Sequence, residues 1–223
     1  MPNIVGYGNT QVPTNAMLGD LAYQDSVDVK VIPKIKAKIN EGASAGKNTV
    51  FVYDTSKDSD GGAWRKRTKH TSWYNEPPSS TRGTRKEFPS IAIIVGTNNY
   101  IDIYDADDPL CPLWMRFLAG SGGHSNCTMV QNAGVAHKVC MLNGILIEGS
   151  TTGSDNWGNA IINFISEEVV RADPNTGEGG YYTGNISQRN QTTGSGYTNE
   201  GKGPQIANSR IRSLAMKVLP DAR

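Results

Sequence analysis

Short apolar runs and alternating apolar and polar positions dominate the chain after residue 48. Period-two alternation and β-branched residues are typical of strands. Glycine, asparagine, serine and threonine fill the stretches between the runs, most of all over 172–209, where we expect long loops. Residues 48–223 are therefore predicted to form an antiparallel β domain, either β-propeller-like or a sandwich. The expected strands are TVFVY (49–53), IAIIV (91–95), YIDIYD (100–105), LWMRFLA (113–119), HKVCML (137–142), ILIEGS (145–150), AIINFIS (160–166) and RIRSLAMKV (210–218).

Two of the connections carry hairpin signals. Gly96-Thr97-Asn98-Asn99 joins IAIIV to YIDIYD and has the length and composition of a hairpin loop. Asn143-Gly144 joins HKVCML to ILIEGS, and this residue pair accepts the positive φ angles that a two-residue hairpin turn requires. Both connections indicate antiparallel neighbours.

Residues 1–47 follow a different pattern, which predicts an extended arm, one short helix and a linker. Only VKVIPKIKAKIN (29–40) has helical spacing, and Pro33 would have to lie in its first turn. EGASAGKN (41–48) is typical of a flexible linker. A helix this short must pack on something, so the region is either an attachment arm that docks on a partner or a poorly ordered terminus. On the attachment interpretation, the partner-contacting residues are Val12, Met17, Leu18, Leu21, Tyr23, Ile35 and Ile39.

Composition narrows the functional classes. The 223 residues carry a net charge of +1, which argues against a dedicated nucleic-acid binder. No apolar run has the roughly 20 residues of a membrane helix, so we expect no membrane insertion. The opening MPNIVGYGNTQVP has neither segment of a signal peptide. With three cysteines that cannot all pair, the chain is expected to fold in a reducing cytoplasm and could be released later by lysis.

The acidic loop DTSKDSDGGAW (54–64) is either a calcium site or a turn. In an EF-hand alignment, Arg67 stands where a bidentate glutamate belongs, and a cation there would repel the ion. The stretch SKDSDGGAW (56–64) resembles the Asp-box hairpin of sialidase-like propellers, with one inserted residue and Ala63 in place of threonine. We therefore predict a β-hairpin over 51–67, with its turn within 56–62 and Trp64 buried.

No metal or cofactor site is expected. HSNC (124–127) and HKVC (137–140) supply two His-x-x-Cys pairs. Residues three apart on a strand point to opposite faces, so His137 and Cys140 could not reach one ion. Cys140, in the apolar VCML, is predicted to be a core residue.

Catalytic patterns are weak. There is no Gly-x-Ser-x-Gly motif. Paired carboxylates in IYDADDP could serve acid–base chemistry, but Asp-Asp-Pro after a strand favours a turn whose carboxylates accept backbone hydrogen bonds. The residues concerned are Asp105, Asp107 and Asp108 of this stretch and Asp102, which directly precedes it.

Aromatic and basic residues suggest a further, weaker binding hypothesis. WRKRTKHTSWYNEPP (64–78) has the composition of a single-strand nucleic-acid platform, but with so little net charge we favour a solvated strand face followed by a loop. Loop aromatics, expected to be exposed, could stack on sugar rings of a host surface glycan. They are Trp73, Tyr74, Trp157, Tyr181 and Tyr182.

Several stretches resemble virion structural proteins of marine phages, especially those of cyanobacteria, which are labelled tail fibres or fibre-like appendages. The stretches are YGNTQVPTNAMLGDLAYQ, VFVYDTSKDSDGGAWRKRTKHTSWYNE, RGTRKEFPSIAIIV, YTGNISQRN and SLAMKVLPDA. The resemblance spans most of the chain and carries over no catalytic residues. It implies an N-terminal attachment region followed by the first strands of a β-propeller. Similar proteins continue past the equivalent of Asp221-Ala222, which implies that this chain forms the first part of a longer fibre.

The leading expectation is thus a homotrimeric virion protein, assembled in the host cytoplasm, that binds other tail proteins and serves host adhesion. The alternative is an enzyme, a propeller hydrolase (depolymerase) that degrades host glycans. That activity would need arginines clustered with the carboxylates of 102–108. The arginines concerned are Arg65, Arg67, Arg82 and Arg85.

Overall fold

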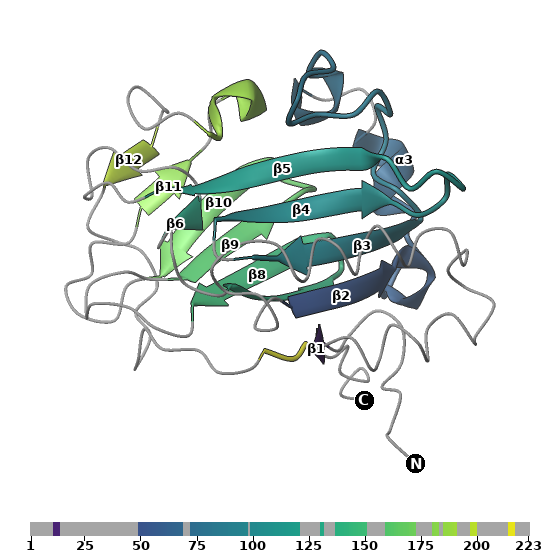
Figure 1. Cartoon of the computed structure of the whole chain (residues 1–223), viewed down its shortest axis with the longest axis horizontal. Helices are drawn as coiled ribbons and strands as arrows, with labels where there is room; N and C mark the ends of the chain where they lie inside the picture. Colours follow the sequence, from purple (N-terminus) through teal and green to yellow (C-terminus); the bar gives the residue numbers. More distant parts are fainter. Residues whose placement is uncertain are drawn as a thin grey trace.

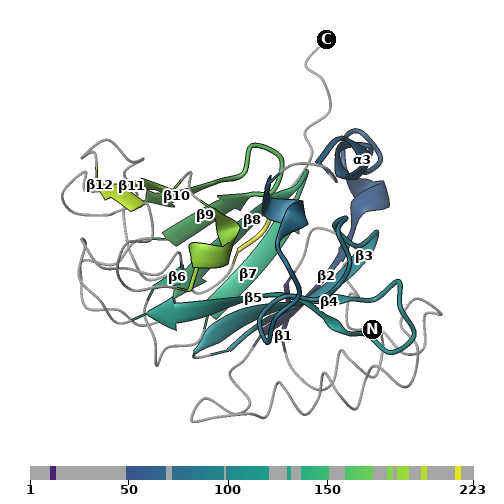
Figure 2. The same ribbon diagram turned by 90° about the horizontal axis from the view of Figure 1, so that it is seen from above.

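The computed structural model shows two six-stranded sheets packed face to face (Figures 1 and 2). It describes residues 11–13, 49–68, 72–97, 99–120, 130–131, 137–150, 159–172, 180–182, 185–190, 197–199 and 214–216. The prediction of a mainly β, antiparallel domain is confirmed. Of the two architectures considered, the stacked sheets are those of a sandwich.

The first sheet contains the N-terminal strands in sequence order. Its strand pairs are antiparallel except for the last, β5 with β6, which is parallel. The loop that begins at Thr97 connects β3 to β4, as its composition predicted. The strands are β1 (Gln11–Pro13), β2 (Thr49–Asp54), β3 (Ile91–Gly96), β4 (Tyr100–Asp105), β5 (Leu113–Gly120) and β6 (Val130–Gln131).

The second sheet is antiparallel throughout. Asn143 and Gly144 join its first two strands with φ angles of 51° and 71°, so the predicted tight hairpin is confirmed. The predicted strand over 160–166 ends earlier, at Asn163, and a turn follows. In spatial order the strands are β12 (Tyr197–Asn199), β11 (Gly180–Tyr182), β10 (Glu168–Ala172), β9 (Asn159–Asn163), β8 (Ile145–Ser150) and β7 (His137–Leu142).

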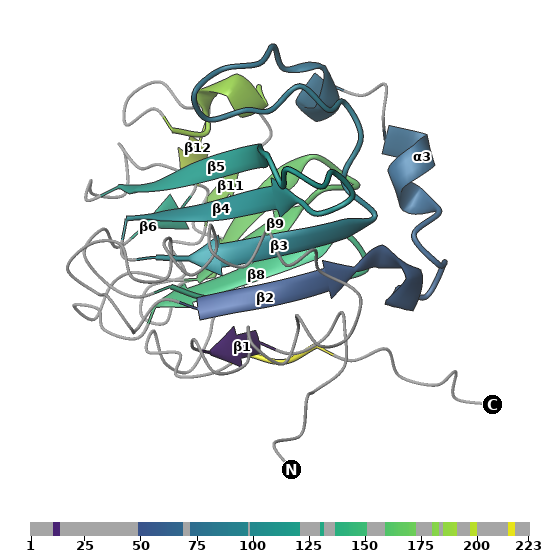
Figure 3. The same cartoon turned by 45° about the vertical axis from the view of Figure 1, so that its right-hand side comes forward.

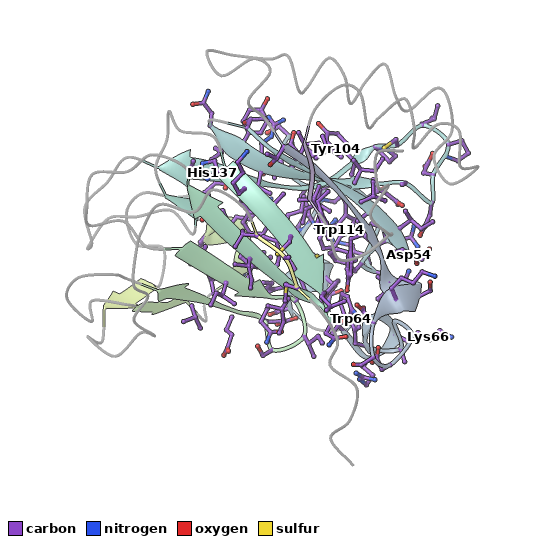
Figure 4. The ribbon with its side chains drawn as sticks, turned by 90° about the horizontal axis from the view of Figure 1, so that it is seen from below. Asp54, Trp64, Lys66, Tyr104, Trp114 and His137 are labelled. Carbon is purple, nitrogen blue, oxygen red and sulfur yellow. The ribbon has the colours of Figure 1, made fainter. Side chains whose placement is uncertain are left out.

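Alternate residues of the central strands fill the space between the sheets. Phe51 and Ile94, which are register partners on β2 and β3, belong to this core and are fully buried. At its centre Phe88 lies 4.8 Å from Trp114 and 5.2 Å from Phe164, measured between ring centroids. Figure 4 shows Trp114 between the two sheets. Tilted and edge-on aromatic contacts of this kind add to the free energy gained from apolar burial.

The 51–67 segment corrects the sequence prediction. β2 ends at Asp54, a 3₁₀ turn (η1, Thr55–Lys57) follows, and Trp64–Thr68 form a short helix, α3, instead of a second hairpin strand. The cause is Asp60, whose carboxylate accepts from the backbone N–H of Gly62 at 3.0 Å and of Trp64 at 3.0 Å. A side chain that accepts the first N–H groups of a turn favours helix over strand. The burial of Trp64 is confirmed, at 1% exposure.

Two further 3₁₀ turns, η2 (Ser72–Asn75) and η3 (Ile186–Gln188), complete the described helical structure. Of residues 1–47 only β1 is described, where Val12 pairs with Val50. The predicted helix over 29–40, the linker and the other six predicted partner-contacting residues lie outside the described residues. Within the predicted strand over 210–218 the structure describes 214–216, where Ala215 forms an isolated bridge. None of the described helices has the length and apolar character to span a membrane.

Candidate functional site

A pocket of about 460 Å³ opens where β4 ends. Asp105 closes the strand, and the loop that follows contributes Asp107 and Asp108 to the lining. Arg85 approaches from the segment before β3, and its Nη1 lies 2.9 Å from Asp105 Oδ1 and 2.8 Å from Asp107 Oδ2. Two carboxylates therefore neutralise the arginine that lines this pocket.

Asp107 also holds the loop to the start of β3. Its Oδ2 accepts from the backbone N–H of Ser90 at 2.8 Å, and its Oδ1 accepts from that of Ile91 at 3.0 Å and from the Ser90 hydroxyl. Burial raises the pKa of the Asp107 carboxyl, but these hydrogen bonds and Arg85 outweigh it and bring the pKa below its ordinary value. The prediction that these carboxylates accept backbone hydrogen bonds in a turn is confirmed here.

Asp102 does not join that group. It is fully buried within β4, where Arg116 donates from Nε at 2.6 Å and from Nη2 at 2.7 Å. Tyr104 donates from its hydroxyl to Asp102 Oδ2 at 2.8 Å. Burial, and then the charge of Asp102, raise the pKa of the Tyr104 hydroxyl above its ordinary value, so this tyrosine remains protonated.

The four arginines expected to cluster in an enzyme bind separate partners. Arg65 pairs with Glu87 at 3.3 Å, Arg67 with Asp60 at 3.0 Å and Arg82 with Glu76 at 3.6 Å. Among the ion pairs of the described residues, those of Arg85 are the ones that link one of these four arginines to a carboxylate of 102–108. The arrangement fixes loops to the sandwich and does not gather positive charge at one site.

The acidic loop before α3 is organised around Asp58. Asp58 Oδ2 accepts from the Tyr53 hydroxyl at 2.6 Å and from Trp64 Nε1 at 2.8 Å, while Oδ1 accepts from the backbone N–H of Asn143 at 2.7 Å. Burial raises the pKa of the Asp58 carboxyl despite these hydrogen bonds. Asn143 belongs to the β7–β8 hairpin, so one carboxylate ties β2, α3 and the second sheet together. The loop is a turn, as predicted, with a role in joining the sheets.

A buried cluster of three charges was missed from the sequence. Glu76 lies 2.7 Å from Arg189 and 3.6 Å from Arg82, and all three side chains are almost fully buried. Burial, together with the charge of Arg189 and against that of Glu76, lowers the pKa of Arg82 to about 10. No local sequence motif indicates this cluster, because Glu76 and Arg82 lie in the loop after η2 and Arg189 lies directly after η3.

The same segments cover the edge of β5 before residue 119, where its pairing with β6 begins. Gly83 N–H donates to the Trp114 carbonyl at 2.9 Å, and Arg116 N–H donates to the Thr81 carbonyl at 2.9 Å. Asn190 accepts from the Leu118 N–H at 2.7 Å and donates to the Arg116 carbonyl at 3.1 Å. A covered edge cannot pair with a strand from another chain, so β5 is protected along these residues.

The residues of the metal hypothesis have structural roles where they are described. His137 Nδ1 lies 2.6 Å from Glu148 Oε1, and both side chains are buried. Cys140 belongs to the hydrophobic core, and burial raises the pKa of its thiol to about 12. His124 and Cys127 lie outside the described residues. Within the described part of the chain, no group of three metal-ligating side chains occurs.

The expected aromatic platform is wrong for the two residues that can be judged. Trp73 and Tyr74 are buried, at 1% and 0% exposure, because their rings pack on the core residues Phe164 and Trp114. The Tyr74 hydroxyl donates to the Phe164 carbonyl at 2.6 Å. Tyr181 and Tyr182 lie in β11, and Trp157 lies outside the described residues.

Comparisons with protein families, curated proteins and solved structures find no match for this chain.

Proposed function

We propose that this chain is a structural, non-enzymatic component of a phage particle, a tail-fibre-like protein that attaches through its N-terminal region and serves host adhesion. The resemblance of YGNTQVPTNAMLGDLAYQ and the other stretches quoted above to marine phage virion proteins supports the phage assignment. A homotrimer that binds other tail proteins is part of the same proposal, with host surface glycan as the candidate receptor.

One observation supports the structural role: the charged side chains that catalysis would need are already held in ion pairs and hydrogen bonds within the fold. Asp102 is bound by Arg116 and Tyr104, and Asp107 by Arg85 and the start of β3. Acid–base pairs of glycan hydrolases need carboxylates in contrasting environments that face a substrate. Here the carboxylates hold the sandwich and its loops in place, as the rigid scaffold of a particle requires.

The direct test is location in the particle. Mass spectrometry and antibody labelling of purified virions, from the phage that encodes this chain, should find it at the tail. Its recovery only from the soluble fraction of the lysate would overturn the virion assignment.

The attachment role is tested in the full chain with Leu18→Asp and Leu21→Asp. A charge at an apolar contact should prevent incorporation into particles without changing the thermal unfolding of the purified protein. Gln24→Asp, at a polar position of the same segment, is the matched control and should incorporate normally. Normal incorporation of both leucine variants would contradict attachment through this segment.

A further inference from the structure

The first sheet has a second apolar face, which points away from the sandwich core. Because side chains alternate along a strand, Val50 and Val52 point opposite to the core residue Phe51. On β3, Ile93 and Val95 do the same relative to Ile94. All four residues of this outer face are buried, at 0%, 3%, 1% and 0% exposure in the order Val50, Val52, Ile93 and Val95.

The outer face is continuous across three strands. Val50 stands opposite Val95 and Val52 opposite Ile93 in the β2–β3 register. On β4, Tyr104 is the register partner of Ile93, and Asp102, which is already neutralised by Arg116, is the partner of Val95. An antiparallel sheet with one solvated face has polar residues on that face. An apolar, buried outer face therefore requires a covering layer.

The described helical turns do not provide this layer. Figures 1 and 3 show α3 beside the ends of the strands and the 3₁₀ turns η2 and η3 beyond the β5 edge, with none of these described elements across the outer face of β2, β3 and β4. Because these exposures are those of the single chain, the cover comes from another part of the same chain.

The pairing of β1 with β2 selects the N-terminal region of the same chain. Pro13 is the register partner of Thr49, so the intervening residues, 14–48, begin and end at the same edge of β2. This connecting segment contains VKVIPKIKAKIN, and both of its ends are held beside the outer face by the pairing of β1 with β2. A segment anchored in this way reaches the face of its own sheet at a far higher effective concentration than a separate molecule.

The segment has the pattern that such a face needs. On a helix, Val31, Ile32, Ile35 and Ile39 share one apolar arc, and Lys30, Lys34 and Lys38 lie outside it. A helix over 29–40 would be about 18 Å long, which suffices to cross three strands spaced about 4.8 Å apart.

We propose that residues 29–40 dock as an amphipathic helix on the outer face of β2, β3 and β4 of the same chain. Ile35 and Ile39 then contact the sheet and do not contact a tail protein. The particle contact is correspondingly confined to the segment with Met17, Leu18, Leu21 and Tyr23. This inference concerns the isolated protein and does not depend on the virion assignment.

Photo-cross-linking in the full-length protein tests it. A benzophenone amino acid at Ile35, and separately at Ile39, should cross-link on irradiation to peptides that contain 50–52 or 93–95, as identified by mass spectrometry. The same group at Lys30, outside the apolar arc, should give no cross-link to these peptides. Two positions are used because the probe at one of them could disturb the docking.

Mixing copies labelled with ¹⁴N and ¹⁵N separates docking within a chain from docking between chains. The proposal predicts cross-linked peptide pairs that are wholly ¹⁴N or wholly ¹⁵N. Mixed pairs would overturn docking on the same chain and indicate an exchange between copies. Cross-links from Ile35 and Ile39 that avoid the outer face would overturn the assignment of the occupant.

Discussion

Arg189 donates from one guanidinium nitrogen to both carboxylate oxygens of Glu76, at 2.8 and 2.7 Å, although 113 positions separate the two residues in the chain. Arg189 also donates to the Thr81 carbonyl at 2.7 Å and to the Arg116 carbonyl at 2.7 Å. The pair thus joins the end of η3 to the end of η2 and to the covered edge of β5. Arg82 shares the same carboxylate, which is therefore the counter-ion of two buried guanidinium groups.

Replacement of the Glu76 carboxylate should lower the free energy of unfolding substantially. Glu76→Gln keeps the shape of the side chain but leaves two buried positive charges without a negative partner. We expect the free energy of unfolding, measured by equilibrium urea denaturation, to fall by about 3–5 kcal/mol.

Glu87→Gln is the matched control, because Glu87 pairs with Arg65 where its side chain is 31% exposed. It should lower the free energy of unfolding by less than about 1 kcal/mol. Equal losses in the two variants would show that the buried cluster has no special role.

Asp58 offers a second test of how the sheets are joined. Asp58→Asn replaces one acceptor oxygen by an amide donor, which faces either the Tyr53 hydroxyl and Trp64 Nε1 or the Asn143 N–H. An unsatisfied buried group costs about 1–3 kcal/mol, so we expect the free energy of unfolding, measured by thermal or urea denaturation, to fall by this amount.

Ser59→Ala is the control, because it removes one exposed hydroxyl that is bonded to Asn143 at 3.1 Å. A hydrogen bond has a typical net value of about 1 kcal/mol, so this variant should lower the free energy of unfolding by less than about 1 kcal/mol. If the serine variant is the less stable of the two, the joining role of Asp58 is wrong.

The sequence was sufficient for the strands with local signals, β2 to β5 and β7 to β9. The short strands β1, β6 and β10 were not predicted, and β11 and β12 lie in 172–209, where long loops were expected. TVFVY and IAIIV have β-branched and aromatic residues in short runs, and Asn143-Gly144 has the backbone freedom that a tight hairpin requires. The structure buries both faces of the same two runs, which their continuous apolar character is consistent with but which was not predicted.

The sequence failed where a distant or unexpected contact decides the conformation. The alternation in WRKRT predicts a strand, but the carboxylate of Asp60 fixes the first turn of a helix there. Trp73 and Tyr74 were expected to be exposed because they lie in a polar stretch, yet both are buried, and Tyr74 bonds to Phe164. The pairing of Glu76 with Arg189 has no local signal, since burial and proximity arise only when the sandwich has formed.

Acid should weaken the protein partly through Asp107, whose pKa is lower in the folded state than its ordinary value of 3.8. A carboxyl with a depressed folded pKa contributes stability that is present above its unfolded pKa and is lost as the pH falls through the folded pKa. Asp107→Asn removes this contribution. The free energy of unfolding of the variant should therefore fall less steeply than that of the wild type as the pH is lowered below about 4. Ser90→Ala, which removes one of the hydrogen bonds that depress the pKa, should give an intermediate slope. Urea denaturation of the three proteins between pH 6 and the acid range measures these slopes, and parallel curves for wild type and Asp107→Asn would contradict the assignment.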